Sequence, residues 1–170
     1  MLKYYKYFLF IWLGLIFCAH GYAQTSTYGK LQAAYVYNFA KYIKWPNNFE
    51  VFNISVLGET EITEDLKAVL KNKKASGKEI ALNVINTLEE AKDINILYVP
   101  SSRSRDLPYI LKTLEGKNVL VLTEEDLARK GATISFIMED DKLGFKINKN
   151  VLIKAGLTVS EGLLKMAVII

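Results

Sequence analysis

YGKLQAAYVYNFAKYIKWP, residues 28–46, predicts one long helix around which the rest of the chain is organised. At ~100° per residue the polar side chains share one sector, and these are Lys30, Tyr37, Asn38, Lys41 and Lys44. The apolar arc is roughly 200° wide, about twice what a surface helix needs. We therefore expect this helix to be covered on more than one side, by its own domain or by another chain. Trp45-Pro46 is expected to end it, because the residue before a proline avoids helical dihedrals.

The segment before this helix, residues 1–23, has the anatomy of a secretory signal peptide. Lys3 and Lys6 form a basic start, residues 8–19 form an uncharged apolar run, and residues 21–23 form a small-x-small cleavage site. We expect cleavage between Ala23 and Gln24 and export across the inner membrane to an oxidising compartment. A retained N-terminal anchor is the alternative, although the apolar run is shorter than the ~20 residues that span a bilayer. Cys18 is a weak lipidation candidate, because Phe17 precedes it where a lipobox has a small residue.

Cleavage would leave residues 24–170 as a single domain with a limited chemical repertoire. The chain's only cysteine and only histidine, Cys18 and His20, lie in the removed segment, and the formal net charge falls from +4 to +2. Without histidine or cysteine there is no Ser-His-Asp triad, thiolate nucleophile or zinc knuckle. A weakly basic chain is also a poor candidate for nucleic-acid binding through phosphate contacts. We expect no cofactor, no metal and no nucleic acid.

Carboxylates are the remaining route to catalysis. The best acidic candidates are Asp126, Glu139, Asp140 and Asp141. Residues 139–141 read as the solvated tip of a hairpin, and none of the four has the spacing of a recognised acid–base pair. A carboxylate hydrolase is therefore a minor alternative, and we expect the protein not to be an enzyme.

Strands and helices alternate along the remainder of the chain. The predicted strands are residues 51–57, 79–85, 94–99, 118–122, 132–138 and 143–148, with 157–159 extended. The predicted helices are residues 63–70, 88–92, 106–114, 124–129 (capped by Thr123), 149–155 (ended by Gly156) and a last one capped by Ser160. This order predicts an α/β fold, a mixed and mostly parallel sheet flanked by helices on both faces, as in a Rossmann-like three-layer sandwich. The late hairpin is expected to add an antiparallel edge.

A candidate ligand crevice follows from the expected sheet. Ligands tend to lie beyond the carboxyl ends of parallel strands, which brings residues 58–60, 101–105 and 123–126 together. Arg103 and Arg105, with Ser101, Ser102 and a helix N-terminus, have the chemistry of an anion site. The alternative is that the serines cap the helix and the arginines are solvated.

Several stretches together resemble the YfiR-like family of bacterial periplasmic proteins. They are the helix AAYVYNFAKYIKWP (33–46), ISVLG (54–58), the 94–99 strand, GATISF (131–136), FKIN (145–148), and AGLTVS with LLKMA (155–160 and 163–167). The resemblance spans the expected mature chain in order. The helix and the tail are its most specific parts.

The resemblance implies regulation of a membrane signalling protein. Such proteins bind the periplasmic sensor domain of an inner-membrane diguanylate cyclase and repress it, and release raises cyclic di-GMP and favours exopolysaccharide and biofilm. An outer-membrane lipoprotein can sequester the repressor, and a histidine kinase can replace the cyclase as target. The redox-responsive disulfides of well-known members are excluded here, because the expected mature chain has no cysteine. A periplasmic small-molecule (anion) sensor using the crevice is the alternative function.

The first helix is the predicted partner or homodimer surface. Tyr37, Asn38, Lys41, Lys44 and Trp45 are the predicted partner-binding residues, because aromatic side chains anchor interfaces. Tyr37, Lys41 and Lys44 are expected to be exposed. Tyr35 and Phe39 are expected in the core rather than in an interface.

Overall fold

The computed structural model describes residues 21–170, with side chains from Tyr28 onward. The predicted signal segment, residues 1–23, lies outside the described residues except for its last three, which are part of the backbone of α2 (Gly21–Tyr42). Within residues 21–170, no helix is both long enough and apolar enough to cross a bilayer.

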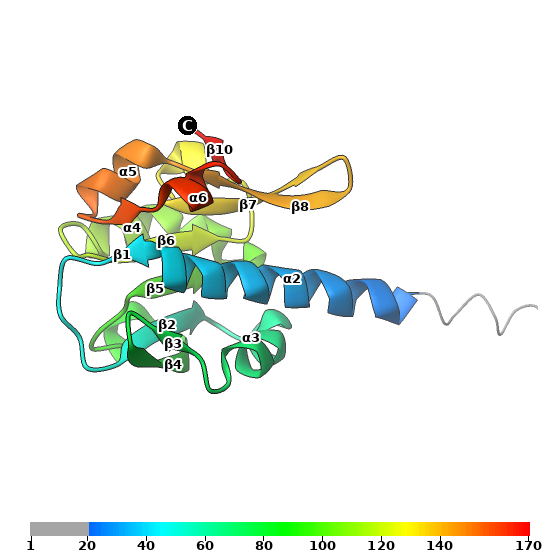
Figure 1. Ribbon diagram of the computed structural model, residues 1–170, viewed down its shortest axis with the longest axis horizontal. Helices are drawn as coiled ribbons and strands as arrows, with labels where there is room; N and C mark the ends of the chain where they lie inside the picture. Colours follow the sequence, from blue (N-terminus) through cyan, green and yellow to red (C-terminus); the bar gives the residue numbers. More distant parts are fainter. Residues whose placement is uncertain (1–20) are drawn as a thin grey trace, which may run out of the picture.

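The middle layer of the fold is an eight-stranded sheet (Figure 1). Its strand order is β10-β8-β7-β6-β5-β2-β4-β3. The strands, in chain order, are β2 (Phe52–Leu57), β3 (Lys74–Ala75), β4 (Lys78–Ile85), β5 (Ile96–Val99), β6 (Leu120–Thr123), β7 (Ile134–Glu139), β8 (Lys142–Ile147) and β10 (Val168–Ile169). A second, two-stranded sheet pairs β1 (Ile43–Lys44) with β9 (Thr158–Val159) in antiparallel fashion.

The pairing directions confirm a mixed, mostly parallel sheet. β4, β2, β5 and β6 are parallel neighbours, as the sequence predicts, and β7 continues the parallel run beside β6. β8 returns antiparallel to β7. The prediction that this hairpin ends the sheet is wrong, because β10 pairs in parallel with β8 and forms the edge. The two residues of β10 were predicted neither as a strand nor as a helix, since so short an element has no periodicity to detect.

Helices cover both faces of the sheet, which confirms the three-layer arrangement. One face packs against α2, α3 (Ile62–Leu70), α5 (Lys149–Lys154) and α6 (Glu161–Leu164), through a core that includes Val36, Phe39, Leu66, Leu152 and Leu163. The other face packs against α4 (Leu107–Thr113) and the short 3-10 helices η2 (Leu88–Glu90) and η4 (Ala128–Lys130). A third 3-10 helix, η3 (Ser101–Asp106), precedes α4.

The first helix ends at Tyr42, four residues before Pro46, so the predicted end is wrong. Ile43 and Lys44 pair with Val159 and Thr158, and the Ser160 amide donates to the Tyr42 carbonyl at 3.1 Å. Ile43 is almost completely buried and β-branched, which suits an extended backbone. The distant strand β9 therefore supplies the hydrogen bonds that a longer helix would have made.

The predicted helix at residues 124–129 is also wrong, since only Ala128–Lys130 form a 3-10 turn. Thr123 was expected to cap that helix. Instead it is buried at the end of β6, where its hydroxyl bonds the Ser135 hydroxyl at 2.7 Å and donates to the Glu125 carbonyl at 2.8 Å. The Leu127 amide donates to Ser135 Oγ at 3.1 Å. These contacts leave no free oxygen arranged to start a helix.

The predicted caps of the last helices are confirmed in part. Ser160 Oγ accepts from the Leu163 amide at 3.4 Å, as predicted. Asn148 caps α5, accepting from the Val151 amide at 3.1 Å. Gly156 follows α5 with φ of +70°, which confirms it as the helix stop.

Candidate partner-binding face

α2 lies across the sheet with one long side exposed (Figure 1). Ala33, Val36, Phe39 and Ala40 are fully buried against the strands. On the solvent side, Lys41 is exposed, Asn38 is half-buried, and Leu31 and Tyr42 remain 44% and 40% exposed. We call Leu31, Tyr37, Asn38, Lys41 and Tyr42 the α2 face. It combines apolar and aromatic groups, which interfaces favour, with a lysine, which suits the polar rim of an interface.

Tyr35 and Phe39 belong mainly to the core, as expected. The Tyr35 ring meets Phe145 edge-on at 5.2 Å, and its hydroxyl donates to the Leu143 carbonyl at 3.3 Å. Phe39 is fully buried and contacts Phe145 at 5.0 Å between ring centroids. The aromatic cluster fixes the rotation of α2 on the sheet, so it determines which residues reach the α2 face.

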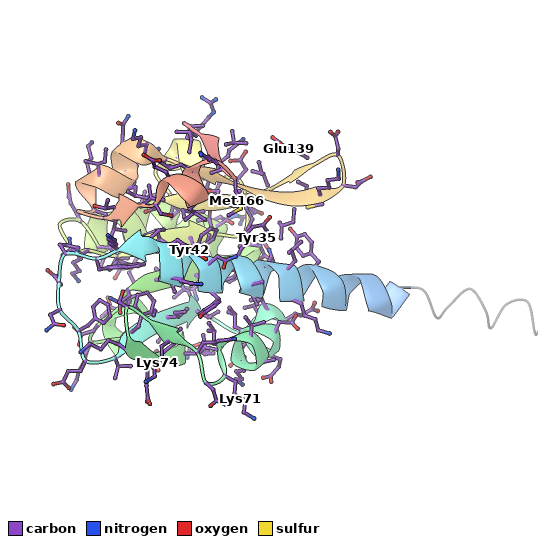
Figure 2. The ribbon with its side chains drawn as sticks, in the orientation of Figure 1. Tyr35, Tyr42, Lys71, Lys74, Glu139 and Met166 are labelled. Carbon is purple, nitrogen blue, oxygen red and sulfur yellow. The ribbon has the colours of Figure 1, made fainter. Side chains whose placement is uncertain are left out.

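Lysines from the α3–β3 connection extend the α2 face. Lys73 Nζ lies 5.6 Å from the centroid of the Tyr37 ring, and Lys41 Nζ lies 4.9 Å from that of Tyr42. Lys71 and Lys74 project from the same connection, below α2 in Figure 2. We call Tyr37, Lys41, Lys71, Lys73 and Lys74 the basic flank.

The charge of the basic flank is poorly compensated. In the part of the chain that the structure describes, none of its four lysines forms a salt bridge, although Glu79 lies opposite Lys74 in the β3–β4 pair. Hydrogen bonding with the Tyr42 side chain raises the pKa of the Lys41 ammonium, so Lys41 stays charged. The flank therefore presents several positive charges near one aromatic helix surface.

The structure separates the five predicted partner-binding residues into two groups. Tyr37, Asn38 and Lys41 share the α2 face, where Lys41 is exposed as predicted. Tyr37 is half-buried against the core, so the prediction that it is exposed is wrong. Lys44 is exposed in β1, beyond the end of the helix. Trp45 lies in the loop that follows, where its ring packs edge-on against Phe52 with 4.9 Å between centroids.

The segments predicted to line the crevice lie close together at the carboxyl ends of the strands. The Ser101 amide donates to Glu124 Oε2 at 2.7 Å, and the Arg103 guanidinium approaches Gly58 and donates to the Asn86 carbonyl at 3.3 Å. Arg103 Nε also pairs with Asp106 at 2.5 Å, whereas Ser102 and Arg105 are exposed. Two of the groups expected to bind an anion are thus bound to carboxylates of the chain itself.

Of the acidic candidates, Asp126 and Glu139 line one pocket with Glu124 and Lys146, whereas Asp140 and Asp141 are not among its lining residues. Asp126 forms a salt bridge with Lys146 at 2.5 Å. Asp140 and Asp141 form the turn between β7 and β8 with φ of 48° and 59°, and Glu139 lies opposite Lys142. Residues 139–141 are therefore a hairpin tip, as predicted.

The basic flank and the loop around Trp45 contain candidate functional residues that could not be identified from the sequence. Lys71, Lys73 and Lys74 read as an exposed connection, and nothing in the sequence shows that Lys73 reaches Tyr37, more than thirty positions earlier. Trp45 turns out to line a pocket with Phe49, Asn53, Asn95 and Asn118. Isolated asparagines at such separations have no recognisable spacing.

Solved structures share this architecture at low sequence identity. The ABC domain from Streptococcus pneumonia, solved in complex with L-Trp, aligns with a TM-score of 0.56 and 13% identity over 84% of this chain and 60% of that one. A conserved domain protein from Vibrio cholerae O1 biovar El Tor aligns with a TM-score of 0.53 and 12% identity over 81% and 59%. The chain thus spans about three fifths of each structure, and the likeness shows the fold alone. No curated protein matches the chain.

A family model identifies the chain more closely. The model described as YfiR/HmsC-like, DUF4154, matches residues 29–168, from the first turns of α2 to β10. The match covers both the helix and the tail on which the resemblance was based. The chain therefore belongs to the YfiR/HmsC-like family.

Proposed function

We propose that this chain is a periplasmic regulatory protein that binds the sensor domain of an inner-membrane diguanylate cyclase and represses its output. Family membership over residues 29–168 is the observation that carries the proposal. In this account the segment 1–23 directs export and is cleaved after Ala23. Loss of repression raises cyclic di-GMP and, with it, biofilm and exopolysaccharide.

The α2 face and the basic flank are the surface that we assign to the partner. Interfaces place aromatic anchors among polar groups that fix orientation, and Tyr37 and Tyr42 each lie beside one lysine here. Uncompensated lysines favour a partner of opposite charge, because complementary electrostatic potentials speed the association of two proteins and fix how they align at the interface. The sensor domain is therefore expected to present an acidic surface to α2.

An anion-sensing module using Ser101, Ser102, Arg103 and Arg105 is the less supported alternative. The Ser101 amide already donates to Glu124, and Arg103 Nε already pairs with Asp106. An incoming anion would have to displace a carboxylate at each group. The crevice therefore gives less support to a sensor than the α2 face gives to a binding protein.

Capture of the partner from native envelopes tests the proposal. Tagged protein, crosslinked in the cell, is purified and its partners are read by mass spectrometry. Lys41→Glu should reduce recovery of the inner-membrane partner at least about tenfold, since about 1.4 kcal/mol is a factor of ten and like charges across an interface cost that or more.

Lys112→Glu is the matched control. Lys112 is an exposed lysine on α4, which covers the opposite face of the sheet. The two variants have the same net charge and should have equal melting temperatures. Equal recovery of the partner by both variants would rule out the α2 face, and recovery of no membrane signalling protein by the wild type would contradict the function itself.

A further inference from the structure

An amide-rich pocket lies at the end of the sheet opposite the crevice. It is formed where the loop after β1 meets the amino ends of β2, β5 and β6, at the left of the molecule in Figure 1. Its volume is about 970 Å³, within the range of small-molecule sites. Five asparagines contribute to its lining, and these are Asn47, Asn48, Asn53, Asn95 and Asn118.

Hydrogen bonds within the chain hold some of these amides in place. Asn95 Oδ1 accepts from the Asn53 backbone amide at 2.8 Å, and the Asn95 backbone amide donates to the Asn53 carbonyl at 2.9 Å. Asn47 Nδ2 donates to Asn118 Oδ1 at 2.6 Å, and Asn118 Nδ2 donates to the Ala155 carbonyl at 2.8 Å. Rigid polar groups of this kind are what a binding site needs to fix the orientation of a ligand.

Other groups at the pocket keep free hydrogen-bonding capacity. No hydrogen bond between groups of residues 28–170 uses Asn95 Nδ2, Asn53 Oδ1, Asn47 Oδ1 or the side chain of Asn48. The pocket thus presents donors and acceptors side by side.

The charges around the pocket argue against an ionic ligand. Lys92 and Lys117 are matched by Glu50 and Asp93, so the lining has no net charge. A purely apolar ligand would bury the amides without partners, which is costly. A neutral ligand with many hydroxyl groups, which both donate and accept hydrogen bonds, matches the uncharged lining and supplies partners for the amides.

An aromatic wall completes the site. Trp45 and Phe49 line the pocket and are both half-buried. Phe52 supports both rings edge-on, at 4.9 Å from Trp45 and 5.4 Å from Phe49 between centroids. The negative face of an aromatic ring attracts the positive edge of C–H groups, which are what the flat faces of a sugar ring present.

We propose that this pocket binds a neutral glycan, with the sugar hydroxyls on the asparagine amides and the sugar faces against Trp45 and Phe49. The site is distinct from the α2 face, so the proposal does not depend on the regulatory function. A secreted glucan and an amino-sugar polymer of the cell wall share this chemistry and are separated by the choice of probe.

Intrinsic fluorescence provides the test, because Trp45 lies at the site. The chain has one other tryptophan, Trp12, and full-length protein carrying Trp12→Phe therefore reports on Trp45 alone. Cellotetraose and chitotetraose are titrated separately up to about 10 mM, a range that detects binding free energies of only a few kcal/mol. We expect a saturable change with at least one probe, and the stronger one identifies the source.

Asn95→Asp tests the assigned residues. The substitution keeps Oδ1, which accepts from the Asn53 amide, and replaces the free donor Nδ2 with an oxygen. We expect about tenfold weaker binding, whereas Asn150→Ala, an exposed asparagine on α5, should leave binding unchanged. The proposal is overturned if neither probe gives a saturable change, or if Asn95→Asp binds as tightly as the control.

Discussion

Gly156→Ala tests how the loop after α2 is held in place. Gly156 ends α5 with φ of +70°, and its amide donates to the Ile153 carbonyl at 2.9 Å while the Leu157 amide donates to the Leu152 carbonyl at 3.1 Å. This is the pattern of a glycine-ended helix. A Cβ at this position would lie 2.7 Å from Asn118 Nδ2 and 3.6 Å from Pro46 Cγ.

The expected cost has two parts. A non-glycine residue in the left-handed region costs about 1–2 kcal/mol. Moving Asn118 away weakens its bonds to Asn47 and Ala155, and each typically contributes about 0.5–1.5 kcal/mol. Because Asn47 is exposed, water replaces part of that loss, and we expect a total of about 2–3 kcal/mol in the free energy of unfolding.

Urea unfolding monitored by circular dichroism measures this cost, with Gly162→Ala as the control. Gly162 lies in α6, and a Cβ there would meet no atom within 4 Å. Alanine favours a helix over glycine by about 1 kcal/mol, so the control should be neutral or stabilising. In an Asn118→Ala background the cost of Gly156→Ala should fall to the backbone part alone. The reasoning is refuted if Gly156→Ala loses less than about 0.5 kcal/mol.

Two further predictions concern Tyr98 and the β7–β8 turn. Tyr98 is fully buried, and its hydroxyl has no hydrogen-bond partner among the described residues. Burial, followed by the charges of Glu124 and Tyr28, raises its pKa. Below the unfolded pKa of about 10, Tyr98 is protonated in both states and the fold keeps its full stability. As the pH rises above that value, the unfolded state loses this proton first, so the free energy of unfolding falls. Between about pH 9 and pH 11, wild-type stability should thus fall more steeply than that of Tyr98→Phe, and parallel urea midpoints would contradict the assignment. Asp141→Gly should raise the free energy of unfolding by about 0.5–1 kcal/mol, because both turn residues have positive φ; thermal denaturation measures this, and a lower melting temperature would refute it.

The sequence predicts the layers of this fold well because they depend on local patterns. Apolar runs such as 94–99 identify buried strands. The apolar arc of α2 is wider than a surface helix needs, and this width predicts that the helix is covered on more than one side. The errors occur where distant segments compete for backbone groups. Ile43 and Lys44 leave the helix for β9, and Thr123 bonds Ser135 instead of capping a helix. In both cases the hydrogen-bonding partner, β9 or Ser135, lies in a later element of the chain. No periodicity in the sequence links the two segments.

The candidate sites also combine residues that local patterns predict with residues that only distant contacts bring together. The α2 face could be predicted for Tyr37, Asn38 and Lys41, because a helical wheel places them together. Lys73 joins them only through the turn between α3 and β4. The pocket beside Trp45 depends on strand register, since Asn53 and Asn95 meet across neighbouring strands.

The cellular level of cyclic di-GMP tests the central claim most directly. It is measured in the native bacterium after deletion of this chain and after complementation with wild type, Lys41→Glu or Lys112→Glu at equal protein abundance. The account predicts that deletion raises cyclic di-GMP severalfold, and that wild type and Lys112→Glu restore the low level while Lys41→Glu does not. An unchanged level after deletion would contradict the claim that this protein represses a cyclase.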